Sequence, residues 1–277
     1  MFKFYMLLPA LVLAPLPAQA TLNWSFTTAS QTNYGTQGTF QGSPGSGSVI
    51  VKAYSTTDDA TNPDRFETGT LGSWSGGIGV TSLEDGDFGS APNHAFDNDG
   101  NSTDEKPAGD VDAAVFAFNQ SITLTSLSIG WKYTDADISV LAYTGQNGSM
   151  TTPDNITGKS ITDLLSSGWQ FIGHYMDLNT TANPSISPSA LINPTNVSSS
   201  YWLVSAYTSC ASSCNSYDGN FGNDYFKISG LTGKTAPPPP SGSVPEPSSL
   251  ILLTGGLLGW RITRKNQLVE SDCKISA

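Results

Sequence analysis

The chain has 277 residues and a formal net charge of −11 at pH 7, because 23 acidic residues outnumber 12 lysines and arginines. Such an acidic chain repels phosphate groups, so nucleic-acid binding is not expected. Only 13% of the residues are charged, which leaves Ser, Thr, Asn and Gly to keep the surface soluble, as suits an extracellular protein.

The first 20 residues predict a cleaved secretory signal peptide and export through the Sec translocon. Lys3 supplies the positive charge, and residues 6–14 form a short apolar run. Small residues at 18–20 place the cleavage between Ala20 and Thr21. An uncleaved N-terminal anchor is the alternative, but the run is short and interrupted by proline.

Residues 21–233 predict an all-β fold, an antiparallel β-sandwich of jelly-roll type. Short segments with period-2 alternation are separated by Gly, Ser, Asn and Pro, and only 161–168 shows weak helical periodicity. In the first segment Leu22, Trp24 and Phe26 share one face. Eight such segments suit a sandwich; they are 22–27, 49–54, 111–118, 122–131, 137–143, 169–175, 201–207 and 225–229.

The apolar residues of segment 122–131 change parity between Leu124 and Leu127. A period-2 pattern that slips by one residue indicates a β-bulge or a tight bend, expected here near Thr125-Ser126. Trp131 has the same parity as Leu127 and is therefore expected in the core.

Residues 55–110 are predicted to be irregular, and long irregular segments usually bind something or are fixed by an ion. Closely spaced oxygen ligands around a glycine turn suit Ca²⁺. Asx-rich turns are also common without any ion, so both interpretations stay open. Asp135 and Asp137 form a second, weaker acidic group, either loop ligands or charges at a strand edge. The predicted calcium ligands are Asp97, Asp99, Asn101 and Asp104.

Cys210 and Cys214 predict a small-loop disulfide, because an even pair of cysteines in an exported protein is usually oxidised. A metal site is the alternative, but it would need further soft ligands nearby, and the chain has only two histidines. Cys273 lies in the C-terminal tail.

The C-terminal part begins with a Pro-rich linker, 234–243, which is expected to extend as a stiff spacer. The following stretch, 244–265, contains Pro245-Glu246-Pro247 and an apolar run. That run is short for a bilayer, which needs about 20 apolar residues. The run ends at Arg261, Arg264 and Lys265, a basic cluster of the kind that stays cytoplasmic, and residues 266–277 form a cytoplasmic tail.

The stretch 244–265 resembles the PEP-CTERM sorting signal of Gram-negative bacteria that produce exopolysaccharide, with Pro245-Glu246-Pro247 as the signature. The resemblance implies a transient anchor in the inner membrane. It also implies that an exosortase, a membrane-embedded protease, recognises the triplet, removes the tail and passes the protein to the cell surface or extracellular matrix. An ordinary single-span C-terminal anchor is the alternative.

The ectodomain also resembles the exosortase-dependent surface proteins. That family is defined by sorting and sequence, so the resemblance implies no active site. The residues that carry it are His94, Asp97-Asn98, Gly130-Trp131, 137–141 and 222–230.

The tryptophans either fill the core or offer a platform for stacking on sugars. Trp74 is flanked by Ser and Gly and is the candidate glycan contact, whereas Trp131, Trp169 and Trp202 are expected in the core.

No nucleophile elbow, zinc motif or phosphate loop occurs in the sequence, so no enzymatic activity is predicted. His94 beside Asp97 could act as a general base, but a structural histidine is expected. Glu84, Asp85 and Asp87 offer carboxylates of the kind used in glycoside hydrolysis, whose spacing a sequence does not give.

The sequence therefore predicts a non-catalytic protein of the cell surface or matrix, associated with exopolysaccharide or biofilm. A carbohydrate-binding module is the first alternative, and a polysaccharide hydrolase is the second.

Overall fold

The structure is a computed structural model that describes residues 19–57, 65–83, 94–98, 110–178, 189–208 and 224–236. The chain divides into two compact units, Met1–Ala236 and Pro237–Ala277, and every described residue belongs to the first. Cys210, Cys214, the stretch 244–265 and most of the predicted signal peptide lie outside the described residues. Within the described ranges, no helix combines the length and apolarity that crossing a membrane requires.

The all-β prediction is confirmed, since every strand pair is antiparallel and the described ranges contain one short helix. The helix is α1 (Ile161–Ser166). The strands are β1 (Thr21–Ser25), β2 (Thr32–Gly35), β3 (Gln37–Gln41), β4 (Ser48–Thr56), β5 (Phe66–Thr68), β6 (Thr70–Trp74), β7 (Gly77–Thr81), β8 (Phe96–Asp97), β9 (Asp112–Thr134), β10 (Ile138–Tyr143), β11 (Trp169–Tyr175), β12 (Ser189–Leu191), β13 (Ser199–Ala206) and β14 (Asp224–Thr235).

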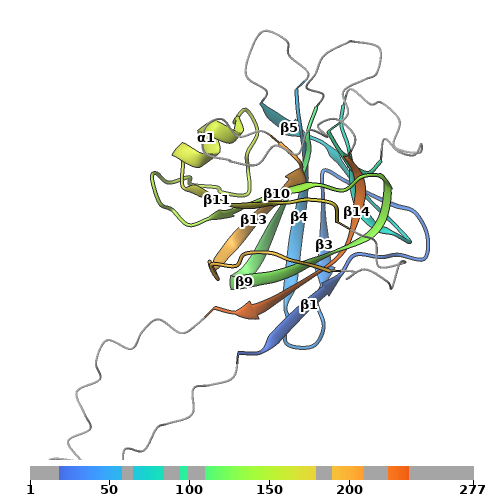
Figure 1. Ribbon diagram of the computed structural model, residues 1–277, viewed down its shortest axis with the longest axis horizontal. Helices are drawn as coiled ribbons and strands as arrows, with labels where there is room; N and C mark the ends of the chain where they lie inside the picture. The colour runs from blue at the N-terminus through green and yellow to red at the C-terminus, as the bar shows by residue number, and fades with distance from the viewer. Residues whose placement is uncertain are drawn as a thin grey trace, which may run out of the picture. The chain divides into compact units, whose positions relative to one another are not determined.

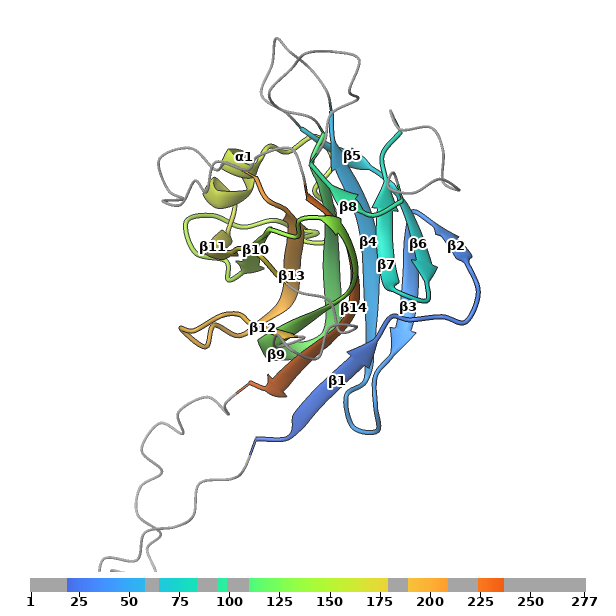
Figure 2. The ribbon, with the colours of Figure 1, turned by 45° about the vertical axis from the view of Figure 1, so that its right-hand side comes forward.

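The long strand β9 belongs to two layers of the sheet. Its first half pairs with β4 and β13, and β3, β10 and β11 extend that layer. Its second half pairs with β14 and β12, and β14 pairs in turn with β1, β7 and β8. Figure 2 shows β10, β11 and β13 on one side of this unit and β6, β7 and β2 on the other.

The two layers face each other across one hydrophobic core. Contacts between aromatic rings connect the two layers. The ring centroid of Phe26, the residue directly after β1, lies 5.7 Å from that of Phe116 in β9, and the centroid of Trp24 lies 4.7 Å from that of Phe118. Leu22, Trp24 and Phe26 are all buried on one face, as the period-2 pattern predicts. Contacts between rings at such distances stabilise a core by about 0.5–1.5 kcal/mol per pair beyond the burial of their area.

A second, smaller core covers the outer face of the first layer, where α1 lies beside β11 (Figure 1). Helix α1 begins with a capping box, in which the Ser160 hydroxyl accepts from the Asp163 N–H and the Asp163 carboxylate accepts from the Ser160 N–H. Leu164 is buried beneath the helix, as is Trp169. This cover makes the first layer apolar on both faces.

Two bulges shape the second half of β9. Thr232 pairs with Ser126 and Gly233 pairs with Leu124, so Thr125 has no partner in the register, which confirms the predicted bulge. A second irregularity skips Gly130 in the pairing with β14. Because one residue of β9 is skipped, Trp131 points to the opposite face of the sheet from the one expected, away from the core.

The predicted core position of Trp131 is therefore wrong, because the slip at Gly130 was not anticipated. Trp169 and Trp202 are buried, as predicted, whereas Trp131 and Trp74 are half-buried.

The prediction that 55–110 is irregular is also wrong in part, since β5 to β8 form there. Likewise β2 and β3 form in the glycine-rich segment after β1, which the sequence did not place. Strand β14 continues to Thr235, two residues beyond the predicted end of the domain at Gly233.

Candidate functional site

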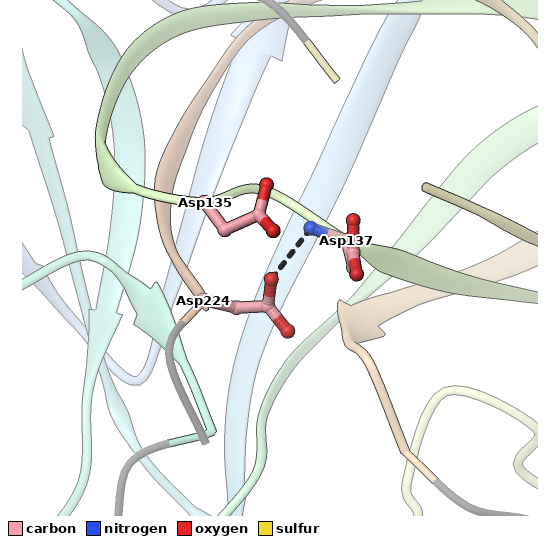
Figure 3. Close-up of side chains that lie close together, drawn as sticks. All are labelled: Asp135, Asp137 and Asp224. Carbon is pink, nitrogen blue, oxygen red and sulfur yellow. Dashed lines mark hydrogen bonds between the residues drawn. The ribbon is translucent and has the colours of Figure 1, made fainter. Parts of the chain in front are cut away.

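Three aspartates converge where β9 turns into β10 and β14 begins. Asp135, Asp137 and Asp224 each offer a carboxylate oxygen, and these oxygens all lie within 4.8 Å of one another. The side chains are buried, with exposed fractions of 7%, 1% and 0%. We call these three residues the acidic cluster; they are drawn in Figure 3.

Asp224 is held from two sides by hydrogen bonds. The Asp137 backbone N–H donates to its Oδ1 at 2.7 Å, the bond drawn dashed in Figure 3, and the Asn98 Nδ2 donates to its Oδ2 at 2.6 Å. Asn98 is fully buried and also accepts from the Asp224 N–H through its Oδ1 at 3.1 Å. The segment after β8 therefore fixes the first residue of β14.

The other two carboxylates are positioned by a tight reversal of the chain. Thr134, at the end of β9, has a φ of 56°, and Asp135 then forms an isolated bridge with Asp224. The Ala136 N–H donates to Asp135 Oδ1 at 2.8 Å, and the Asp177 N–H donates to Asp137 Oδ1 at 2.6 Å. Backbone donors thus orient the cluster.

One cation lies beside this cluster. The Lys132 ammonium lies 3.9 Å from Asp135 Oδ1. Carboxylates packed together out of water repel one another, and a bound cation would lower that repulsion. Buried carboxylate and amide oxygens at this spacing are the ligand chemistry that Ca²⁺ prefers.

The acidic cluster joins two groups that the sequence treated separately. Asp97 of β8 is 3% exposed and lies beside Tyr225 in the β8–β14 register, so the predicted calcium segment begins next to the cluster. Asp135 and Asp137 supply the second group. Asp99, Asn101 and Asp104 lie outside the described residues, and their role as calcium ligands stays a prediction.

Asp224 was not singled out from the sequence. The signal that could have found it is its place directly before the apolar strand YFKIS, inside one of the segments that carry the family resemblance.

A second constellation lies further along β14, on the face opposite the core. Lys227 pairs with Trp131 across β9 and β14, and its Nζ lies 4.0 Å from the centroid of the Trp131 ring. The ring of Trp74, at the end of β6, lies 5.0 Å from the same nitrogen. Lys227 is 3% exposed, and this burial lowers the pKa of its ammonium group to about 8.

Two tyrosines continue the same face. Tyr133 and Tyr225 pair across β9 and β14 two positions from Trp131 and Lys227, with ring centroids 5.9 Å apart. Tyr133 is 57% exposed and Tyr225 is buried. We call Trp74, Trp131, Tyr133 and Tyr225 the aromatic strip.

His94 is 8% exposed, and its ring lies 4.3 Å from that of Trp74. It packs against the strip as a structural histidine would. Its role as a general base is not supported by any observation on the described residues.

The other histidine contacts a serine, but not at an open site. Ser139 Oγ lies 2.9 Å from His174 Nδ1 and accepts from the Thr208 N–H at 3.1 Å. Ser139 is fully buried, so no polymeric substrate reaches its hydroxyl. Burial lowers the pKa of His174 to about 4, and this pair is best understood as part of the packing.

Comparison with protein-family models finds the PEP-CTERM protein-sorting motif at residues 243–265. The match contains Pro245-Glu246-Pro247 and the basic residues Arg261, Arg264 and Lys265, as the sequence resemblance predicts. No curated protein and no solved structure matches the chain. The family model covers the sorting stretch alone, so the resemblance of the ectodomain to exosortase-dependent surface proteins stays a prediction.

Proposed function

The chain is a PEP-CTERM protein, sorted by an exosortase as an extracellular protein, and on this premise we propose that its folded unit is a non-catalytic component of the bacterial cell surface or exopolysaccharide matrix. The observation that carries the proposal is the sorting motif at 243–265, placed after an all-β unit that ends by Ala236. The motif says where the unit is delivered, and the two histidines of the described residues are both packed against aromatic rings.

The remaining steps of this proposal follow from the sequence. Residues 1–20 are removed as a signal peptide after passage through the Sec translocon. The jelly-roll-type sandwich folds outside the cytoplasm, where Cys210 and Cys214 pair. The stretch 244–265 then anchors the chain in the inner membrane of a Gram-negative host until the exosortase cuts it.

Mass spectrometry of the mature C-terminus tests the sorting step. We expect the chain to end near Pro245-Glu246-Pro247 in a host that has its exosortase and to keep its tail in a host that lacks it. An intact tail in both hosts would mean that the protein is an ordinary membrane-anchored protein.

Association with the matrix is tested separately. We expect the processed protein to stay in isolated matrix and to be released when the exopolysaccharide is removed.

A second candidate function, glycan binding, is favoured by the aromatic strip. Aromatic side chains on an outer sheet face give the flat apolar surface on which sugar rings stack, and Tyr133 is largely exposed there. A pull-down on host polysaccharide should be lost in Trp74→Ala. Tyr201→Ala, which removes a half-buried ring of the first layer, is the matched control and should bind normally. Equal retention of both variants would exclude the strip as the binding surface.

A polysaccharide hydrolase is the weaker alternative. The carboxylates of the acidic cluster lie close enough for such chemistry, but they are buried, and a polymer has no access to them. The residues Glu84, Asp85 and Asp87 lie outside the described part of the chain.

A further inference from the structure

A pocket opens on the outer face of the first layer, where β4 changes its neighbour at the edge of the sheet. β3 pairs with β4 as far as Lys52, and β5 pairs with β4 from Tyr54 onward. Between the two pairings, the Ala53 N–H donates to the Thr36 carbonyl and the Ala53 carbonyl accepts from the Gly69 N–H. The pocket has a volume of about 240 Å³, and its lining residues that reach solvent are Thr36, Gln37, Lys52, Thr68, Asn155 and Thr157.

Solvent has direct access to this pocket. The residues just named are exposed, except for Lys52, whose side chain is 25% exposed. Gln37 lies opposite Lys52 and Thr68 lies opposite Tyr54 in the strand registers. Directly opposed residues lie on the same face of a sheet, and Tyr54 belongs to the second core on the outer face. A ligand can therefore enter from solvent without opening the fold.

The wall of the pocket opposite the strands is the turn 154–157, which is fixed from two sides. The Tyr54 hydroxyl donates to the Asp154 carbonyl at 2.5 Å, and the Lys52 ammonium lies 2.7 Å from Asp154 Oδ2. Ile156 is fully buried in the second core. Because these walls are held in place before a ligand arrives, binding loses little conformational entropy.

The lining favours an uncharged ligand that is rich in hydroxyl groups. Three threonine hydroxyls and two side-chain amides line the pocket, and each of these groups can both donate and accept hydrogen bonds. The charge of Lys52 is balanced by Asp154, so the pocket offers no net charge to an anion or to a metal ion. An apolar ligand would take the polar groups out of water without replacing their hydrogen bonds.

We propose that this pocket binds one uncharged sugar residue of a glycan through hydrogen bonds to the hydroxyl groups of the sugar. A volume of about 240 Å³ lies just below the range of about 300–1,000 Å³ of sites for drug-sized ligands, which suits a single sugar ring. The exposed rim leaves room for the glycan to continue into solvent. The site goes beyond the second candidate function, because the aromatic strip lies on β9 and β14 of the second layer and shares no residue with this pocket.

The test uses the purified mature protein and ligand-observed NMR titrations with the methyl glycosides of glucose, galactose, mannose and N-acetylglucosamine. Methyl glucuronide is the charged counterpart. Thr68→Val replaces the hydroxyl with a methyl group of similar size, and Thr68→Trp fills the pocket. Thr39→Val makes the same exchange at an exposed position of β3 outside the pocket and is the matched control.

We expect at least one neutral glycoside to bind, with a Kd on the order of 1 mM, as suits so small a ligand. Thr68→Val should raise this Kd roughly three- to tenfold, the effect of one lost hydrogen bond. Thr68→Trp should abolish binding, and Thr39→Val should leave the Kd unchanged. Thermal melting shows which variants are folded, and Thr157→Trp serves as the filled pocket if Thr68→Trp is not folded.

Three results would overturn the proposal. Tighter binding of methyl glucuronide than of methyl glucoside would show that the uncharged class is wrong. Absence of binding by every neutral glycoside, or binding that the filled pocket retains, would show that the pocket is not the site. In that last case, loss of binding in Trp74→Ala would assign the sugar to the aromatic strip, so the second candidate function would stand while this proposal fails.

Discussion

Asp135 is the residue at which the calcium prediction can be tested with the least damage to the fold. Its Oδ1 accepts one hydrogen bond, from the Ala136 N–H, and an asparagine at this position keeps that acceptor. Asp224 accepts from two donors at once, so its replacement would also break the hydrogen bonds that fix β14. Asp135→Asn therefore keeps the hydrogen bond and removes the charge, together with the ion pair to Lys132 at 3.9 Å.

We expect millimolar Ca²⁺ to raise the melting temperature of the wild type and EDTA to reverse the rise. Ligand at 100 times its Kd stabilises the folded state by about 2.7 kcal/mol, which corresponds to roughly 5–10 °C for a domain of this size. Asp135→Asn should lose the response to Ca²⁺ and melt close to the wild type in EDTA, because the removal of one repelling charge offsets the loss of the ion pair with Lys132. Asp154→Asn, at a surface ion pair with Lys52, is the control that keeps the response. A wild type that melts alike in Ca²⁺ and EDTA contradicts the prediction.

His174 should make the folded state sensitive to mild acid. The centroid of its ring lies 4.7 Å from that of Phe171 and 4.6 Å from that of Tyr207. Burial lowers the pKa of the His174 imidazole from 6.5 to about 4. As the pH falls from 6.5 to 4, the unfolded chain takes up this proton and the folded chain does not. The contribution of His174 to stability is therefore complete above pH 6.5 and decreases through this window.

Urea unfolding of the wild type and His174→Gln at a series of pH values from 7 to 4 measures this effect. The free energy of unfolding of the variant should decrease less steeply between pH 6.5 and 4 than that of the wild type. Carboxylates titrate in the same range in both proteins, so only the difference between the two curves reports on His174. Parallel curves would mean that His174 takes up its proton equally in both states.

At the scale of single residues, the sequence predicts which side chains can do chemistry but not which of them meet. Asp97 and Asp137 stand out as acidic residues in polar surroundings. Asp224 does not, and it meets Asp137 across 87 residues of sequence. Local spacing carries no information on such a contact, because only the pairing of β14 with β9 creates it.

Among the elements, strands with large apolar residues at period 2 are the ones that the sequence predicts. β1 has such a pattern, and the bulge at Thr125 is visible as a slip in it. β4 and β10 were predicted from nearly continuous runs of apolar residues, which suit inner strands. The hairpin of β6 and β7 was missed because small residues stand between its buried apolar residues Leu71, Ile78 and Val80. Gly79 is one example, since a Cβ there would overlap the carbonyl oxygen of His94, and a glycine at a close approach looks like a turn residue in the sequence.

Gly130 is the position where that hairpin can be tested. Gly130→Ala forces a Cβ against the Gly76 carbonyl oxygen, which is backbone and cannot rotate away. Overpacking of this kind costs about 1–3 kcal/mol, and we expect urea unfolding to show a loss of that size together with a shift in the fluorescence of Trp131. Gly173→Ala in the edge strand β11, where the nearest contact is the Tyr175 hydroxyl at 3.1 Å, is the control. Equal stability of both variants would show that the hairpin does not rest on β9 as described.

For the molecule as a whole, the two ends of the folded unit leave it side by side. Thr21, the first residue after the predicted signal cleavage, pairs with Lys234 near the end of β14, and Thr235 pairs with Ile122. The predicted signal cleavage, between Ala20 and Thr21, therefore lies directly before β1. Cleavage there would take no described strand out of the sheet.

A variant of the sorting motif should thus separate delivery from folding. Replacing Pro245 and Pro247 with alanine changes residues that do not belong to the unit Met1–Ala236. The melting temperature of the ectodomain should therefore stay within about 1 °C of the wild type. Processing should nevertheless stop, leaving the protein with its tail in the membrane fraction. Pro238→Ala, in the linker and outside the matched motif at 243–265, is the control and should be cut and released normally. Release of the motif variant with a trimmed C-terminus would show that a protease other than one reading this triplet delivers the domain.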